Sequence, residues 1–132
     1  MVPGVVQFIK RHSSLPIGLA TNGEPANVDL VLDGVNIRKH FKAVVTGHEV
    51  RLPKPHPDIY LKAAEMLGMT PENCVVFEDS LTGIEAARAA GMRVAGLTTT
   101  IANLPGVDIS IPHFLDPGLE IWLQSIDAST TV

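Results

Sequence analysis

The sequence predicts an α/β fold, a three-layer sandwich built around a mostly parallel, Rossmann-like sheet. Apolar runs of four or five residues alternate with longer amphipathic segments, which is the pattern of strands joined by helices. The first run, "PIGLAT", is apolar without alternation, as expected for a strand that is covered on both faces. With 132 residues, 45% of them hydrophobic and 18% charged, the chain is sized for one domain.

Residues 1–126 are expected to form this single core. Strands are predicted at residues 16–21, 42–46, 74–79 and 93–98, with a short fifth strand at 107–111. Helices are predicted at residues 4–12, 25–35, 57–68, 81–90 and 117–126. Pro57 and Asp58 suit a helix start, whereas Gly68 and Gly91 suit helix ends. The last residues, 127–132, are expected to fray.

Composition argues against several classes of partner. The net charge of −4 and the absence of a Lys/Arg cluster with interleaved aromatic residues predict no binding to nucleic acid. No apolar run reaches membrane-spanning length, so no membrane partner is expected. The start of the chain has no basic segment ahead of its apolar residues, so we expect a cytoplasmic protein. The single cysteine, Cys74, lies in an apolar run and is interpreted as a small buried residue.

Three expected strands end in chemically distinctive residues, and the carboxyl ends of parallel strands converge on one crevice. The first strand ends in Thr21, Asn22 and Gly23 just before a helix. A hydroxyl, a side-chain amide and free backbone N–H groups at a helix start can hold a phosphate. A capped strand-to-helix turn, which needs the same residue types, is the alternative.

The second feature is Lys54, which lies between Pro53 and Pro55. Pro55 favours an extended backbone at Lys54, so the ammonium is presented from a stiff segment. Lysine is a compact charge that suits a phosphate or a carboxylate cluster. The alternative is a solvated lysine in a proline-rich turn, and the neighbouring His56 is interpreted as a residue beside a helix N-cap.

The third feature is the pair Glu78 and Asp79 at the tip of the strand "CVVFED". Adjacent carboxylates repel unless a cation is near, and hard oxygen ligands suit Mg²⁺. The alternative is that Asp79 or Ser80 caps the next helix while Glu78 forms a surface ion pair. Gly83 inside that helix is unfavourable for local structure, so it indicates close packing or the approach of a ligand.

In this order, "LATN", "KPHPDIY" and "VVFEDSLTGIEAARAAGM" resemble the haloacid dehalogenase superfamily, in particular its β-phosphoglucomutase-like branch of phosphatases and phosphomutases. The resemblance covers residues 3–114. It implies that Thr21, with Asn22 beside it, binds the transferring phosphoryl group, and that Lys54 offsets charge on phosphate and nucleophile. It also implies that Glu78 and Asp79 hold Mg²⁺, with Asp79 as the direct ligand. The implied substrate is a small phosphate ester such as a sugar phosphate.

The resemblance is incomplete in one respect. The family's first motif is a strand ending in Asp-x-Asp-Gly, whose first aspartate attacks phosphorus, and no segment here matches it. "VLDGVN" copies only the tail of that motif, with Val31 where the nucleophile should be. The helical cap domain that selects substrate in this branch is also missing. We therefore expect a truncated catalytic core that is inactive alone.

The missing motif has a structural consequence. In the family's sheet its strand lies between the strands expected here at 17–20 and 74–77, so two edges with unpaired backbone groups would face each other. The two edges could close on each other, a strand from another chain could fill the gap, or the protein could be marginally stable and aggregate. Of these we expect self-association, giving a homo-oligomer. Two alternative functions remain: a receiver-like regulatory module, in which the acidic residues would come early and the lysine last, and a degenerate core kept as an interaction surface.

Overall fold

The structure, a computed structural model, describes residues 2–22, 25–126 and 129–131. Within these ranges six strands form one parallel sheet in the order β2-β1-β6-β3-β4-β5. The strands are β1 (Ile17–Thr21), β2 (Ala43–Thr46), β3 (Cys74–Glu78), β4 (Arg93–Leu97), β5 (Ile109–Ile111) and β6 (Ser129–Thr131). The helices are α1 (Val5–Arg11), α2 (Pro25–Gly34), α3 (Asp58–Leu67), α4 (Leu81–Ala89) and α5 (Pro117–Gln124), with short 3-10 turns η1 (Arg38–His40), η2 (Gly47–Glu49) and η3 (Pro71–Asn73).

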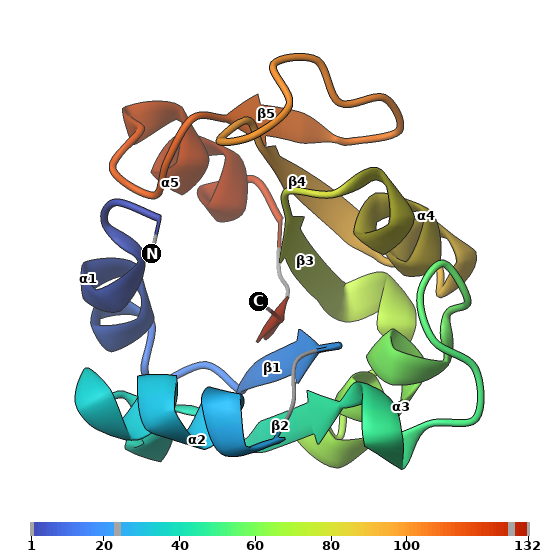
Figure 1. The fold of residues 1–132 in the computed structure, drawn as a ribbon. Helices are drawn as coiled ribbons and strands as arrows, with labels where there is room; N and C mark the ends of the chain where they lie inside the picture. The colour runs from blue at the N-terminus through green and yellow to red at the C-terminus, as the bar shows by residue number, and fades with distance from the viewer. Residues whose placement is uncertain (1, 23–24, 127–128, 132) are drawn as a thin grey trace.

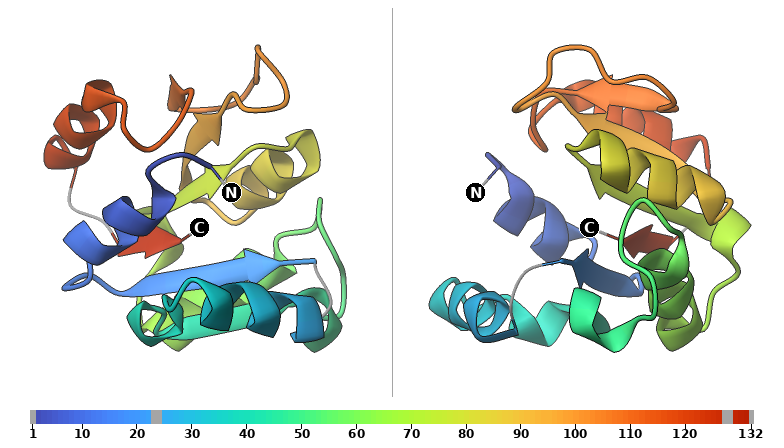
Figure 2. Two further views of the ribbon diagram at one scale, coloured as in Figure 1. Left: turned by 60° about the vertical axis from the view of Figure 1, so that its left-hand side comes forward. Right: turned by 45° about the vertical axis from the view of Figure 1, so that its right-hand side comes forward.

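Helices cover both faces of this sheet, which confirms the predicted α/β sandwich (Figures 1 and 2). Alternate residues of β3 show how the faces divide, because successive side chains of a strand point in opposite directions. Cys74 and Val76 pack with α3 and α4, whereas Val75 and Phe77 pack with α1 and α5. All five residues of β3 are buried. A strand covered on both faces favours a continuous apolar run, which here is Cys74–Phe77 before Glu78 at the strand end.

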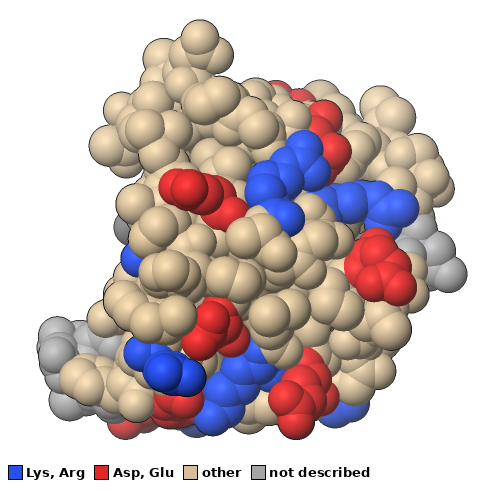
Figure 3. All heavy atoms as spheres, turned by 90° about the vertical axis from the view of Figure 1, so that its right-hand side faces the viewer, with Lys and Arg blue, Asp and Glu red and all other residues tan. Residues whose placement is uncertain are grey.

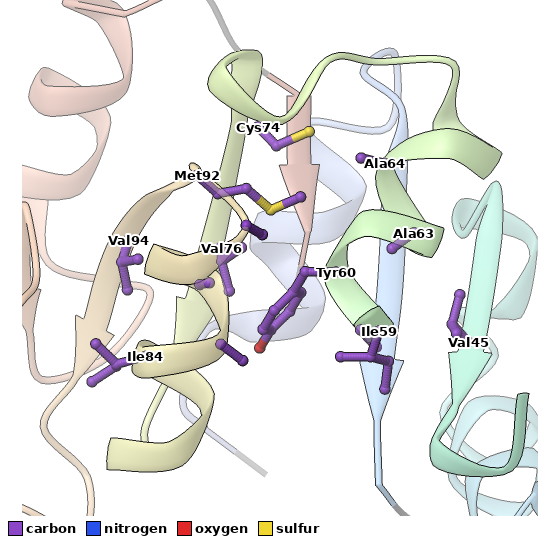
Figure 4. Close-up of a cluster of buried hydrophobic side chains, with 14 of the residues drawn as sticks. Val45, Ile59, Tyr60, Ala63, Ala64, Cys74, Val76, Ile84, Met92 and Val94 are labelled. Atoms are coloured by element: carbon purple, nitrogen blue, oxygen red, sulfur yellow. The ribbon is translucent and has the colours of Figure 1, made fainter. Parts of the chain in front are cut away.

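The core on the first face is centred on α3. Its buried residues follow helical spacing and include Tyr60, Ala63, Ala64 and Leu67. Tyr60 projects from α3 into the space beside α4, among apolar side chains that include Val76 and Ile84 (Figure 4). On the outer surface of α3 and α4, basic and acidic side chains are interspersed (Figure 3).

Helix ends agree with the predictions to within two residues. Helix α3 begins at Asp58, one residue later than predicted, with Pro57 as its N-cap. It ends at Leu67, and its C-cap Gly68 has a φ of +70°. Gly91, with φ +82°, follows Ala90, which is the C-cap of α4. A left-handed conformation at the end of a helix favours glycine, so both residues terminate their helices for the predicted reason.

The end of the chain corrects the prediction of a frayed tail. Ser129–Thr131 form β6, a parallel strand that lies between β1 and β3. It pairs with Ile17 and Gly18 on one side and with the segment Cys74–Val76 on the other. The physical reason is that unpaired N–H and C=O groups on two facing strands are costly, and a third strand satisfies them. Residues 127, 128 and 132 lie outside the described residues.

Candidate active site

A pocket of about 310 Å³ lies at the carboxyl ends of β1 and β3. Thr21, Lys54, Glu78 and Asp79 all line it, and apolar side chains form the rest of its wall. Thr21 is the last residue of β1, Glu78 is the last residue of β3, and Lys54 comes from the loop between η2 and α3. Parallel strands bring these ends together because their carboxyl termini share one edge of the sheet.

Asn22 is the predicted site residue that the pocket wall does not include. It is exposed, and its side chain lies against Gly47 at the start of η2, where an added Cβ would be 3.3 Å from Asn22 Oδ1. The structure therefore brings together Thr21, Lys54, Glu78 and Asp79 and leaves Asn22 beside them.

Glu78 accepts hydrogen bonds from several groups around the pocket. It is only 9% exposed, and both of its carboxylate oxygens accept hydrogen bonds from the protein. Oε2 accepts from Lys54 Nζ at 2.9 Å and from the Tyr60 hydroxyl at 2.6 Å. Oε1 accepts from the Ser80 hydroxyl at 3.0 Å and from the Asp79 backbone N–H at 3.2 Å. The lysine is thus fixed by a buried ion pair and stands over the Tyr60 ring, 5.0 Å from its centroid.

These contacts determine which groups carry charge. Burial alone would raise the pKa of the Glu78 carboxyl, but the charge of Lys54 and the hydrogen bonds from Tyr60, Lys54 and Ser80 hold this pKa below its usual value. Burial, together with the negative charge of Glu78, raises the pKa of the Tyr60 phenol far above its usual range. At neutral pH Glu78 is therefore a carboxylate and Tyr60 a neutral phenol, which donates the hydrogen bond between them.

Gly83 allows this arrangement. The Ser80 hydroxyl caps α4 by accepting a hydrogen bond from the Gly83 N–H at 3.1 Å. A Cβ added at Gly83 would overlap the carboxyl group of Glu78. The glycine therefore marks a close approach, as the sequence indicated, and the group that approaches is a carboxylate of the protein itself.

Asp79 differs from its neighbour. Among the described residues, no hydrogen bond to its carboxylate is present, and it follows β3 directly on the pocket wall. No group of three or more His, Cys, Asp or Glu side chains that could hold a metal occurs in the described part of the chain. Asp79 therefore offers oxygen donors for one or two positions of a cation, and any further ligands must come from elsewhere.

Tyr60 is the residue of this cluster that sequence reasoning missed. It occupies an apolar position of α3, is 1% exposed, and is indistinguishable by periodicity from an ordinary core residue. The signal that was available is its hydroxyl, because a buried tyrosine usually needs a hydrogen-bond partner.

Known proteins share the sequence pattern and the fold of this chain. A family model described as haloacid dehalogenase-like hydrolase matches residues 1–91. The chain belongs to this family. Haloacid dehalogenase-like hydrolases are enzymes, and the match decides against the receiver-like alternative.

Among relatives in this family, protein CbbY of Rhodobacter capsulatus is 40% identical over 124 residues, which are 90% of this chain and 54% of that protein. Phosphoglycolate phosphatase of Escherichia coli is 39% identical over 112 residues, which are 85% of this chain and 44% of the enzyme. The chain thus spans about half the length of these relatives.

Solved structures show the same fold. A β-phosphoglucomutase from Clostridium difficile superposes with a TM-score of 0.80 and 26% identity, over 95% of this chain and 55% of that one. A mutant of CbbY from Rhodobacter sphaeroides, solved in complex with xylulose-(1,5)bisphosphate, superposes with a TM-score of 0.79 and 30% identity, over 89% of this chain and 56% of that one. No helix in the described ranges is both long and apolar enough to cross a membrane.

Proposed function

We propose that this chain provides the phosphate-binding and metal-binding half of a Mg²⁺-dependent phosphoryl-transfer site that acts on a small phosphorylated metabolite. The observation that carries the proposal is the position of Lys54. Its ammonium is held at 2.9 Å from Glu78 in the same pocket wall as Thr21 and Asp79. A fixed cation beside a hydroxyl and a carboxylate suits the stabilisation of a transferring phosphoryl group.

In this proposal each residue has one task. The Thr21 hydroxyl and its neighbour Asn22 bind phosphoryl oxygens, and Lys54 neutralises part of their charge. Asp79 is a direct ligand of Mg²⁺, for which carboxylate oxygens are suitable donors. Both oxygens of Glu78 already accept hydrogen bonds from the protein. Glu78 therefore contributes to the metal site indirectly, by orienting Lys54. Bound Mg²⁺ would supply Lewis-acid stabilisation of charge on the phosphate.

The nucleophile is the component that these 132 residues do not provide. The family resemblance places the attacking aspartate on a strand between β1 and β3, and β6 takes that place here. Ser129, Thr130 and Thr131 contain no carboxylate. Phosphoryl transfer through an aspartyl-phosphate therefore requires a strand that replaces β6, and the chain as given is expected to be inactive.

Names of relatives support the substrate class. Fructose-1-phosphate phosphatase YqaB of Escherichia coli is 43% identical over 61% of this chain, and phosphoglycolate phosphatase is 39% identical over 85%. We infer that the substrate is a small phosphate ester and that the protein acts in the cytoplasm. The second candidate, a core that serves only as an interaction surface, is favoured by β6, because β6 takes the place of the strand that would carry the nucleophile.

A chimaera separates these two functions. The part of E. coli phosphoglycolate phosphatase that lies outside the matched region would be joined to this chain, and hydrolysis of phosphoglycolate would be measured with and without Mg²⁺. We expect Mg²⁺-dependent hydrolysis that falls at least about a hundredfold in Lys54→Ala and in Asp79→Asn. Lys62→Ala, which changes a lysine of α3 outside the pocket, is the matched control. A folded chimaera without activity, or turnover by this chain alone, would contradict the proposal.

A further inference from the structure

A second hollow, of about 440 Å³, lies at the opposite edge of the sheet. Residues 13–16, which lead into β1, and residues 39–42, which lead into β2, form its walls. The Lys42 N–H donates a hydrogen bond to the Ile17 carbonyl oxygen at 2.8 Å and so joins the two segments. This is the amino end of both strands, whereas Thr21 and Asp79 lie at the carboxyl ends.

The lysine side chains that line this hollow are positively charged, although the chain as a whole has a net charge of −4. Lys39 and Lys42 both line it, and its lining contains no Asp or Glu. In the described part of the chain neither lysine forms an ion pair. Arg38, the residue before Lys39, forms ion pairs with Asp29 at 2.6 Å and with Asp33 at 2.8 Å. The nearby carboxylates are therefore used by the arginine, and the two ammonium groups remain available for a ligand.

His40 has a polar atom without a partner, but this atom is closed off from the hollow. Its Nε2 is buried and has no hydrogen-bond partner among the described residues. A ligand in an open hollow cannot reach a buried atom, so the donors must be side chains that are exposed there. His40 lines the same hollow as the two lysines, together with the hydroxyl-bearing Ser13 and Ser14.

We propose that this hollow binds the phosphate group of a small molecule. Two compact ammonium groups and two hydroxyls are donors that match a phosphate dianion. Leu15, Pro16 and Phe41 add apolar surface for the organic part of the ligand. The volume falls within the range of small-molecule sites. The site lies apart from the pocket at Lys54 and does not depend on the function proposed for that pocket.

The test is a titration of the isotope-labelled chain with inorganic phosphate, at constant ionic strength set by chloride, followed by backbone amide NMR. We expect saturable shifts in residues 13–16 and 39–42. The double variant Lys39→Ala/Lys42→Ala should bind at least about tenfold more weakly, since it removes both charged hydrogen-bond donors of the hollow. Both lysines are exposed, so the fold should be retained.

Matched controls complete the experiment. Lys10→Ala/Lys62→Ala removes the same charge outside the hollow and should leave the affinity unchanged. Lys54→Ala removes the other phosphate candidate, and the shifts in residues 39–42 should persist in it. The inference is overturned if the shifts do not saturate, if both double variants bind equally, or if the shifts are confined to the edge that carries Thr21 and Lys54.

Discussion

Glu78 is the residue on which the candidate site depends, because one carboxylate fixes Lys54, Tyr60 and the start of α4. Gly83 is the complement of this carboxylate, since it leaves the space that the carboxyl group fills. The sequence indicated a close approach at Gly83 but not that Glu78 is the approaching group, because it shows that Glu78 and Asp79 are adjacent and not which of them turns inward. Two predictions test these residues directly.

Gly83→Ala should destabilise the protein, although alanine usually stabilises a helix. The new Cβ would overlap Glu78 and force the carboxylate or α4 to move, at a cost of about 1–3 kcal/mol. Gly34→Ala is the control, because Gly34 is also helical and an added Cβ meets no atom within 4 Å. That variant should gain about 0.5–1 kcal/mol. Chemical denaturation measures both, and equal effects of the two substitutions would show that the Glu78 contact is absent.

The pH dependence of stability should reveal the Lys54–Glu78 pair. Because the pKa of Glu78 is lowered in the folded state, the unfolded chain binds more protons in acid. The stabilisation is present above about pH 4.5 and is lost as the pH falls through the lower folded pKa. Glu78→Gln should flatten the decline in unfolding free energy below about pH 5 relative to the wild type.

At neutral pH the same substitution should cost about 3–5 kcal/mol, since it leaves the Lys54 ammonium buried without its carboxylate. Glu85→Gln changes an exposed carboxylate of α4 and should alter neither the slope nor the stability. An identical pH profile for wild type and Glu78→Gln would refute the lowered pKa.

At the scale of elements, β6 depends on its neighbours rather than on its own sequence. Ser129–Thr131 is short and carries no apolar run, so local sequence gave no reason to expect a strand. The other five strands and the helices were predictable because apolar runs and capping residues are local signals. The place of β6 is decided by unpaired backbone groups on β1 and β3, which are close only in the folded chain.

Removal of residues 127–132 should therefore weaken the centre of the sheet. The backbone groups of Ile17, Gly18 and the segment Cys74–Val76 would lose their partners, at about 1–3 kcal/mol for each buried group left unpaired. Amide hydrogen exchange should accelerate in β1 and β3. Amides between β4 and β5, which pair with each other, serve as the internal control for local loss. Unchanged protection in β1 and β3 would show that β6 contributes nothing to the sheet.

At the scale of the whole molecule, the question is how the protein closes its own sheet. The sequence predicted self-association because two inner edges would face each other. The structure shows a further route, in which the chain's own end fills the amino half of the gap. The pairs that β6 forms, with Ile17 and Gly18 on β1 and with Cys74–Val76 on β3, belong to the half of the gap that lies away from the candidate pocket.

This partial closure makes self-association dependent on β6. With β6 in place, the amino half of each inner edge is already paired and cannot pair with a second copy. Without residues 127–132 the full length of both edges becomes a template for pairing, so the truncated chain should form larger species at lower protein concentration. Light scattering on a size-exclusion peak, measured across a dilution series of both chains, gives the comparison. A truncated chain that stays monomeric, with a cooperative melt, would mean that β1 and β3 can pair directly when β6 is absent.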